Sequence, residues 1–180
     1  MKIFFDTEFT GLHKNTTLIS IGLVSELGNS FYAELTDYDE LQIDNWLKNN
    51  IINNLSKNEE DLKTFADHTI KGNSVNVAKV LLNWLDQFDT IEWYSDVSHY
   101  DFVLLIDLLF GNALNMKKGC SAVCHDINQD IATYLSITET EAFDMSREKI
   151  LKRSNISIKG NKHNSIYDAF VIKAIYKLIY

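Results

Sequence analysis

Proline is absent from this 180-residue sequence, and glycine and cysteine are scarce, with seven and two residues. A chain so poor in proline and glycine is neither collagen-like nor linker-rich. Two cysteines cannot form the disulfide framework of a small secreted protein. No apolar run approaches the roughly 18–20 residues of a membrane span; the longest, Phe102 to Phe110, is interrupted by Asp107. We therefore expect a soluble protein that does not enter membranes.

Positive charge is also in short supply, since 17 basic side chains face 25 acidic ones for a net charge of −8. This balance argues against tight, non-specific binding to long duplex DNA, which requires many phosphates to be neutralised. It does not exclude a nucleic-acid enzyme, because the distribution of charge matters more than its sum. Between Arg147 and Lys162, six basic side chains face one acidic side chain. This stretch either guides phosphates or is a solvated helix face.

Hydrophobic residues are plentiful at 46%, and aromatic residues reach 12%. This composition and length predict one folded domain over residues 1–180. Asp6 and Glu8 occur before a signal-peptide apolar region could form, so we expect a cytoplasmic protein. Cys120 and Cys124 lie beside His125, but no second pair of suitable spacing completes a structural zinc site. A reduced, partly buried cysteine pair is the better interpretation.

The order of apolar patterns predicts an α/β protein. Three short strands, Lys2–Asp6, Leu18–Val24 and Ser30–Leu35, have tight connections that indicate an antiparallel meander. Helical and strand patterns then alternate, which predicts one mixed sheet flanked by helices. The expected helices are Leu41–Leu55, Val77–Phe88, a buried Phe102–Phe110, Ile127–Leu135, Glu139–Arg153 and Ser165–Tyr180, and the expected later strands are Ile91–Tyr94 and Val123–His125.

Asp6 and Glu8 are the first residues that suggest chemistry. Positions i and i+2 of a strand point to the same face, and Ile3-Phe4-Phe5 before them should be buried. Two adjacent carboxylates repel each other unless cations lie between them, and Mg²⁺ prefers carboxylate oxygen. Two solvated acids at a strand end are the alternative interpretation.

Two further motifs combine acids with other functional side chains. Asp101 follows Tyr100 at the start of an apolar helix, where its carboxylate either joins a site or caps the helix. His163 precedes the last predicted helix and Asp168 follows five residues later. A neutral imidazole there can accept a proton from water at ordinary pH. The alternative is a packed histidine with an exposed aspartate.

Taken together, these motifs resemble the DEDDh 3′→5′ exonucleases of the ribonuclease H-like superfamily. The first motif of that family often reads Asp-x-Glu-x-Thr-Gly-Leu, the second ends in an aromatic residue and Asp, and the third is His-x4-Asp. The matching segments here are Asp6–Leu12, Tyr100–Asp101 and His163–Asp168. Further segments resemble the small bacterial and phage exoribonuclease branch: Leu18–Val24, Phe31–Glu34, Cys124–Gln129 and His163–Ser165.

The resemblance implies a ribonuclease H-like mixed sheet and hydrolysis of single-stranded nucleic acid from the 3′ end, with RNA favoured and nucleoside 5′-monophosphates as products. It implies two divalent cations, Mg²⁺ or in its place Mn²⁺, with His163 as general base for the attacking water. Asp6, Glu8 and Asp168 would hold one cation, and Asp6 would bridge to a second that Asp101 supports. The residues implied near the terminal nucleotide are Thr7, Phe9, Thr10 and Leu12.

This sequence departs from the family pattern at Asp96, where the family often has Asn; the acid either binds the cations or points away. Asp126 is interpreted as structural. The other histidines are not expected to be ligands, although His99 neighbours Asp101. By analogy a homodimer is possible. The apolar helices that contain Trp46 and Trp84 either form the surface between the two subunits or belong to the hydrophobic core of one subunit.

Three other functions stay open from the sequence. A proofreading or repair-type DNA exonuclease would use the same chemistry and differ only in how the pocket treats the 2′-hydroxyl. A non-catalytic nucleic-acid-binding module is less favoured, because all four acids and the histidine are intact. An endonucleolytic ribonuclease H fits the fold, but its site does not call for the His-x4-Asp arrangement.

Overall fold

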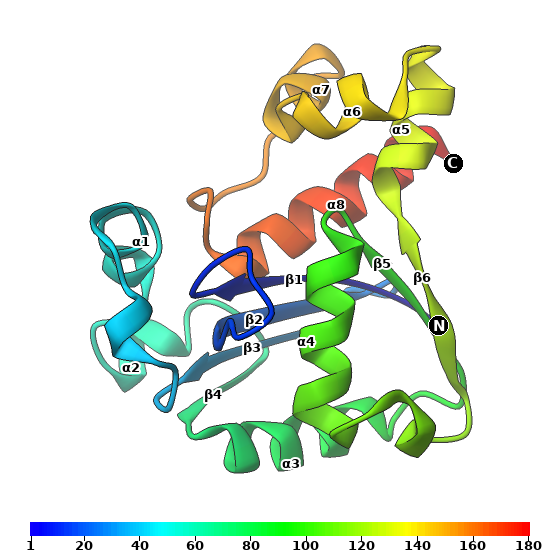
Figure 1. Cartoon of the computed structure of the whole chain (residues 1–180). Coiled ribbons are helices and arrows are strands. Elements are labelled where there is room, and N and C mark those ends of the chain that lie inside the picture. The colour runs from blue at the N-terminus through cyan, green and yellow to red at the C-terminus, as the bar shows by residue number, and fades with distance from the viewer.

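The computed structural model describes all residues, 1–180, as a six-stranded mixed sheet with helices on both faces (Figure 1). The strand order is β4-β3-β2-β1-β5-β6, so β1 lies inside the sheet. The strands are β1 (Lys2–Phe9), β2 (Leu18–Ser25), β3 (Ser30–Leu35), β4 (His68–Gly72), β5 (Ile91–Ser95) and β6 (Cys120–Asp126). Strands β1 to β3 pair antiparallel, and the other three pairings are parallel. The predicted fold class is therefore confirmed.

The helices follow the predicted order with several differences in extent. They are α1 (Asn45–Asn50), α2 (Glu59–Leu62), α3 (Ser74–Leu85), α4 (Ser98–Phe110), α5 (Ile127–Leu135), α6 (Glu139–Asp144), α7 (Arg147–Arg153) and α8 (Ser165–Ile179). None of them combines the length and the apolar composition that crossing a membrane requires.

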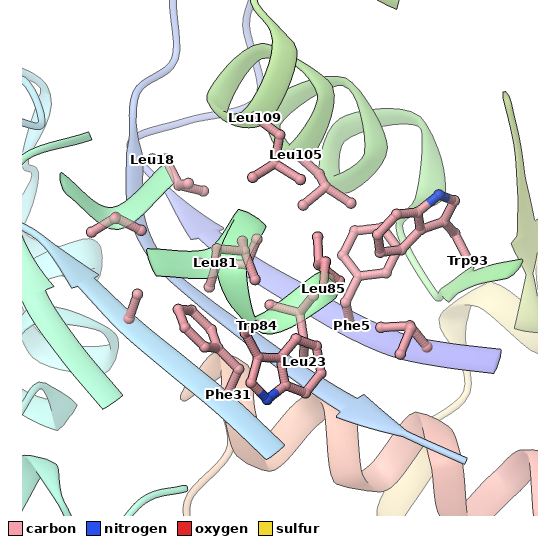
Figure 2. Packing of buried hydrophobic residues seen from close by; sticks show 14 of the residues in the cluster. Phe5, Leu18, Leu23, Phe31, Leu81, Trp84, Leu85, Trp93, Leu105 and Leu109 are labelled. Carbon is pink, nitrogen blue, oxygen red and sulfur yellow. The ribbon is translucent and has the colours of Figure 1, made fainter. Parts of the chain in front are cut away.

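Alternation along the strands supplies a separate core on each face of the sheet. In Figure 2, Phe5, Leu23 and Phe31 of the strands pack against side chains of α3 and α4, such as Leu81 and Leu105. The opposite core combines Phe4 and Tyr94 with apolar residues of α5, α7 and α8. Because both faces are covered, the central strands are buried along most of their length.

The close approach of α8 to β2 depends on Gly22. A Cβ atom built at this position would lie 2.3 Å from the backbone N and Cα of Ile166, near the start of α8. Next to this contact, the hydroxyls of Ser20 and Ser165 are 3.0 Å apart and hydrogen-bonded. Gly22 also pairs with Asp6 of β1. The glycine therefore brings the first turns of α8 close to the acidic end of β1.

Two predicted helices are wrong as continuous elements. The 41–55 segment contains two short 3₁₀ helices on either side of α1, because Asp39 and Asp44 cap new helical starts with their carboxylates. The 139–153 segment divides into α6 and α7, where Met145 is extended and Ser146 caps α7. Side-chain caps of this kind compete with continuation of a helix.

Smaller differences from the predicted fold concern two elements that were not predicted and the extent and burial of α4. The sequence did not indicate β4 or α2; β4 is a short, polar edge strand with little apolar alternation. The α4 helix begins earlier than predicted and buries only one face, since Val103 is exposed. Cys120 and Cys124 are free and partly buried, as expected.

Candidate active site

The acidic residues of β1 point toward α8. Ile3 and Phe5 belong to the core under α3 and α4, whereas Phe4 belongs to the opposite core. Asp6 and Glu8 follow Phe4 at steps of two along the strand, so they share its face. Both residues are 8% exposed, and no protein group donates a hydrogen bond to either carboxylate. The strand thus presents two buried acids without partners.

Burial and mutual repulsion oppose ionisation of this pair. Burial is the largest cause that raises the pKa of Asp6, followed by the nearby carboxylates of Asp101 and Asp168. The pKa of Glu8 is also well above its usual range, first through burial and then through Asp168. A cation between these groups would remove the repulsion and favour their charged forms.

Asp101 lies in the first turn of α4, but it does not cap that helix. The N-cap position is Val97, which makes no side-chain cap. The Asp101 carboxylate instead accepts hydrogen bonds from the Thr7 hydroxyl at 2.5 Å and from the Ser95 hydroxyl. Burial raises its pKa to about 7, although both hydroxyls act in the opposite direction. The cap interpretation is therefore wrong, and the two hydroxyls orient Asp101.

Asp168 lies in the first turn of α8 and is linked to the histidine before that helix. Its Oδ2 accepts a 2.9 Å hydrogen bond from the backbone N–H of His163. Asn164 caps α8 through its side chain. Burial raises the pKa of Asp168 to about 8, with Asp96 contributing next. The capped helix start therefore positions the acid and the histidine together.

His163 has a left-handed backbone conformation with φ of 63°. Its ring meets the edge of the Trp46 ring, with centroids 5.2 Å apart and planes at 75°. Burial lowers the pKa of His163, and the positive charge of Lys162 lowers it further. The imidazole is therefore neutral at ordinary pH and able to accept a proton.

The carboxylates form two groups that share Asp6. The first group consists of Asp6, Glu8 and Asp168, and the second group consists of Asp6, Asp96 and Asp101. Within each group, one carboxylate oxygen of every residue lies within 4.8 Å of the others. A donor set of carboxylates alone suits hard divalent ions such as Mg²⁺ and Mn²⁺. The buried acids of β1 fit such ions, because a divalent cation would offset the repulsion between their carboxylates.

Asp96 follows β5 and pairs with a largely buried arginine. Nε of Arg147 is 3.2 Å from Oδ2 of Asp96. The same guanidinium donates to Oδ1 of Asn128 and to the backbone carbonyls of Ala142, Phe143 and Met145. Because its guanidinium already binds these internal groups, Arg147 is not available to bind the phosphates of a substrate. Lys149 and the other basic side chains up to Lys162 are exposed.

All the motif acids and His163 line one cavity of about 660 Å³. Its wall includes Phe9, which is partly buried, and Leu12, which is exposed. Both were predicted from the sequence to lie near the terminal nucleotide. The wall also includes Trp46, which is 52% exposed, and Phe143. An acidic centre with an apolar entrance is suited to a ligand that carries both phosphate and flat rings.

The four residues implied at the terminal nucleotide differ in what they offer. Phe9 stacks on Tyr100, with centroids 5.3 Å apart, and Leu12 is 73% exposed at the rim. Thr7 uses its hydroxyl on Asp101, and Thr10 donates its hydroxyl to Gln42 at 2.5 Å. The cavity therefore offers the side chains of Phe9 and Leu12, and contact between these residues and a nucleotide stays a prediction.

The sequence did not predict that Trp46 lies against His163 or that Arg147 pairs with Asp96. The apolar spacing around Trp46 suggests core or a dimer surface, and only the tertiary fold brings it to His163. Trp84, its counterpart in the dimer hypothesis, is core against Phe31. The acid at position 96, where the family often has Asn, was the available indication that a basic side chain lies nearby, because a buried extra negative charge needs a counterion. That counterion is Arg147.

Other residues considered from the sequence lie outside the two acid groups. Asp126 accepts hydrogen bonds from Asn128 and caps α5, which agrees with the structural interpretation. The His99 ring packs against Tyr100, and His125 stacks on Tyr94.

This mixed sheet, with its Asp-x-Glu, Tyr-Asp and His-x4-Asp motifs converging at the end of β1, defines a DEDDh-type protein of the ribonuclease H-like fold. The comparison with protein families is more specific. The chain belongs to the 3′-5′ exoribonuclease Rv2179c-like domain family, whose model matches residues 1–180.

Two similar curated proteins come from Mycobacterium tuberculosis. They are 3′-5′ exoribonuclease Rv2179c of strain H37Rv and 3′-5′ exoribonuclease MT2234.1 of strain CDC 1551. Each is 30% identical over 108 residues, which cover 60% of this chain and 61% of the relative. The matched part thus spans about three fifths of these relatives.

Solved structures share the fold at low identity. The nuclease domain of 3′hExo, described as a DEDDh family member bound to rAMP, has a TM-score of 0.65 at 12% identity, covering 97% of this chain and 88% of that chain. Pop2p of S. pombe, in a form bound to Mg²⁺ and Mn²⁺, has a TM-score of 0.63 at 16% identity, covering 99% and 82%.

Proposed function

We propose that this chain is a 3′→5′ exonuclease that hydrolyses single-stranded nucleic acid, with RNA preferred, and uses two divalent cations. The observation that carries the proposal is the convergence of four family acids and His163 on one cavity. The products are nucleoside 5′-monophosphates released one at a time from the 3′ end.

The acids of the site supply the places for the cations. Asp6, Glu8 and Asp168 would hold one, and Asp6 and Asp101 would hold the other. Two divalent ions held there would stabilise the attacking and leaving oxygens of a phosphodiester and lower the pKa of water. Thr7 and Ser95 act through Asp101, because their hydroxyls fix the direction of its carboxylate.

His163 is the general base in this proposal. Its lowered pKa keeps the imidazole neutral, so the ring can take a proton from the attacking water. The hydrogen bond from its backbone to Asp168 ties the base to a cation ligand. Trp46 limits the movement of the ring by packing against it. Both contacts place His163 in the wall of the cavity that the acids line.

The substrate is proposed from the cavity wall and from the relatives. The exposed rings of Trp46 and Phe143, together with Phe9 and Leu12, offer surfaces for unpaired bases. Base–aromatic stacking contributes about 1–3 kcal/mol per base with little sequence preference. The family description and both curated relatives are named as exoribonucleases, which favours RNA over DNA.

The test compares 5′-labelled single-stranded RNA and DNA of one sequence, with Mg²⁺ or Mn²⁺. The expected result is a ladder that shortens from the 3′ end, faster on RNA, and that disappears with EDTA or in Asp6→Asn. Asp107→Asn is the matched control, since Asp107 is an exposed acid of α4 outside the cavity. Faster shortening of DNA would favour the DNA-exonuclease alternative, and binding without shortening would favour a non-catalytic module.

A further inference from the structure

Asp96 adds a fifth carboxylate to the four acids of the family pattern. One of its oxygens lies within 4.8 Å of oxygens of Asp6 and Asp101, in the second of the two acid groups. We propose that Asp96 is a direct ligand of the second divalent cation and that Arg147 is the residue that positions it. This inference rests on the proposed function and deepens it, because it assigns a ligand beyond the family acids.

The unpartnered state of Asp6 indicates that this second group takes a ligand. Asp6 is more than nine-tenths buried, and no hydrogen bond from the protein reaches its carboxylate. Its oxygen nevertheless faces those of Asp96 and Asp101 at less than 4.8 Å. Three carboxylates at this separation repel each other unless a cation lies among them.

The free oxygen of Asp96 makes it a suitable third ligand. Its Oδ2 pairs with Arg147, whereas its Oδ1 forms no hydrogen bond with another side chain. Asp101, in contrast, uses one oxygen for the Thr7 hydroxyl and the other for the Ser95 hydroxyl. Divalent ions bound by carboxylates need several oxygens, so Asp96 adds a third carboxylate to those of Asp6 and Asp101.

Arg147 provides the outer support that metal-binding carboxylates usually have. Nη1 donates to the carbonyls of Ala142 and Met145 at 2.9 and 2.5 Å, and Nη2 donates to the side chain of Asn128. The guanidinium therefore cannot rotate away from Asp96 without losing these bonds. Through its bond to Met145, the guanidinium also holds the α6–α7 connection, which forms part of the cavity wall.

The charges of the cluster agree with this assignment. Five carboxylates and the guanidinium of Arg147 leave four negative charges, which two divalent cations balance. Asp96 can therefore join the cation site without leaving it over-charged, because its own counterion is built into the fold.

The test measures Mn²⁺ binding by calorimetry and electron paramagnetic resonance, without substrate. Wild-type protein is expected to bind two ions. In Asp96→Asn the second ion should bind at least tenfold more weakly, with the first unchanged. Asn can still accept the hydrogen bond from Arg147, so this substitution keeps the contact between the two side chains. Arg147→Met should weaken the second ion about 10–100-fold, as loss of an outer partner does. Asp107→Asn, the exposed acid of α4, should bind as wild type does.

Unchanged affinity for both ions in Asp96→Asn would overturn the assignment while leaving the proposed function intact. Wild-type protein that binds no Mn²⁺ would overturn both. If the single variant does not fold, the double variant Asp96→Asn/Arg147→Met replaces it, since it leaves no unpaired guanidinium. That variant is also expected to lose the second ion, and two ions of wild-type affinity would again overturn the assignment.

Discussion

Gly22 of β2 touches the backbone of Ile166 so closely that no side chain fits between them: an added Cβ would lie 2.3 Å from the Ile166 N and Cα atoms. Two residues after Ile166, the same helix carries Asp168. The distance between β2 and α8 therefore sets the position of an acid of the site relative to Asp6, which pairs with Gly22.

Gly22→Ala is expected to lower both stability and activity, because α8 must move away from the sheet. Overpacking of this kind costs about 1–3 kcal/mol, which corresponds to roughly 2–4 °C in Tm for each kcal/mol. Melting curves and 3′→5′ activity measure the two effects. Gly72→Ala is the control, since its Cβ would make an ordinary 3.6 Å contact with Asn76. An equal, small effect of both variants would contradict the expectation.

The metal-free protein is expected to lose stability as the pH rises from the acidic range to about 7 to 8, and to change little above it. Asp101 and Asp168 have folded-state pKa values of about 7 and about 8, raised mainly by burial. Between the ordinary carboxyl pKa of 3.8 and these values, the folded state keeps protons that the unfolded state has released, so the free energy of unfolding falls as the pH rises and levels off once the carboxyls ionise.

Melting curves in EDTA between pH 5.5 and 8.5 measure this loss. Mg²⁺ should reduce it, because the cations favour the ionised carboxylates. Asp6→Asn should also reduce it, since one source of repulsion is gone. A Tm that does not depend on pH in EDTA would contradict the raised pKa values of these acids.

The rate should decline on the acidic side below the ordinary histidine pKa of 6.5, because burial and Lys162 lower the pKa of His163. His163→Gln should lower kcat by about 10²–10⁴-fold and remove this decline when cations are saturating. Steady-state rates from pH 5 to 8 measure both. Mn²⁺ affinity is the control; His163→Gln with nearly full activity would exclude His163 as the base.

Trp46 should affect catalysis through His163 as well as through substrate contact. An aromatic pair contributes about 0.5–1.5 kcal/mol, so Trp46→Ala should reduce kcat/KM about 2–10-fold. Trp46→Phe should recover part of this loss. Separate measurement of kcat and KM distinguishes the roles, because a loss confined to KM means that Trp46 contacts substrate without positioning the histidine.

The strands and the motif acids were predictable because their signals are local. Apolar alternation identifies β1, and the step of two places Asp6 and Glu8 on one face. The helical pattern of Ser165–Tyr180 likewise places His163 just before the helix that contains Asp168. These features depend on neighbours in the sequence.

Other parts of the site depend on contacts between distant segments. The pairing of Asp96 with Arg147 and the packing of Trp46 on His163 each join residues more than fifty positions apart. The division of the 139–153 segment depends on the Ser146 cap and on the carbonyls that Arg147 binds. Apolar periodicity contains no information on such contacts.

The hydrogen bond from the His163 backbone to Asp168 makes two functions depend on one carboxylate. Replacing Asp168 would remove a proposed cation ligand and, at the same time, the acceptor of the hydrogen bond from the left-handed backbone of His163. The effects of Asp168→Ala and His163→Gln are therefore less than additive in combination. In the proposed mechanism the proton acceptor and one cation ligand therefore form a single structural unit, because a change at Asp168 also removes the partner of the His163 backbone.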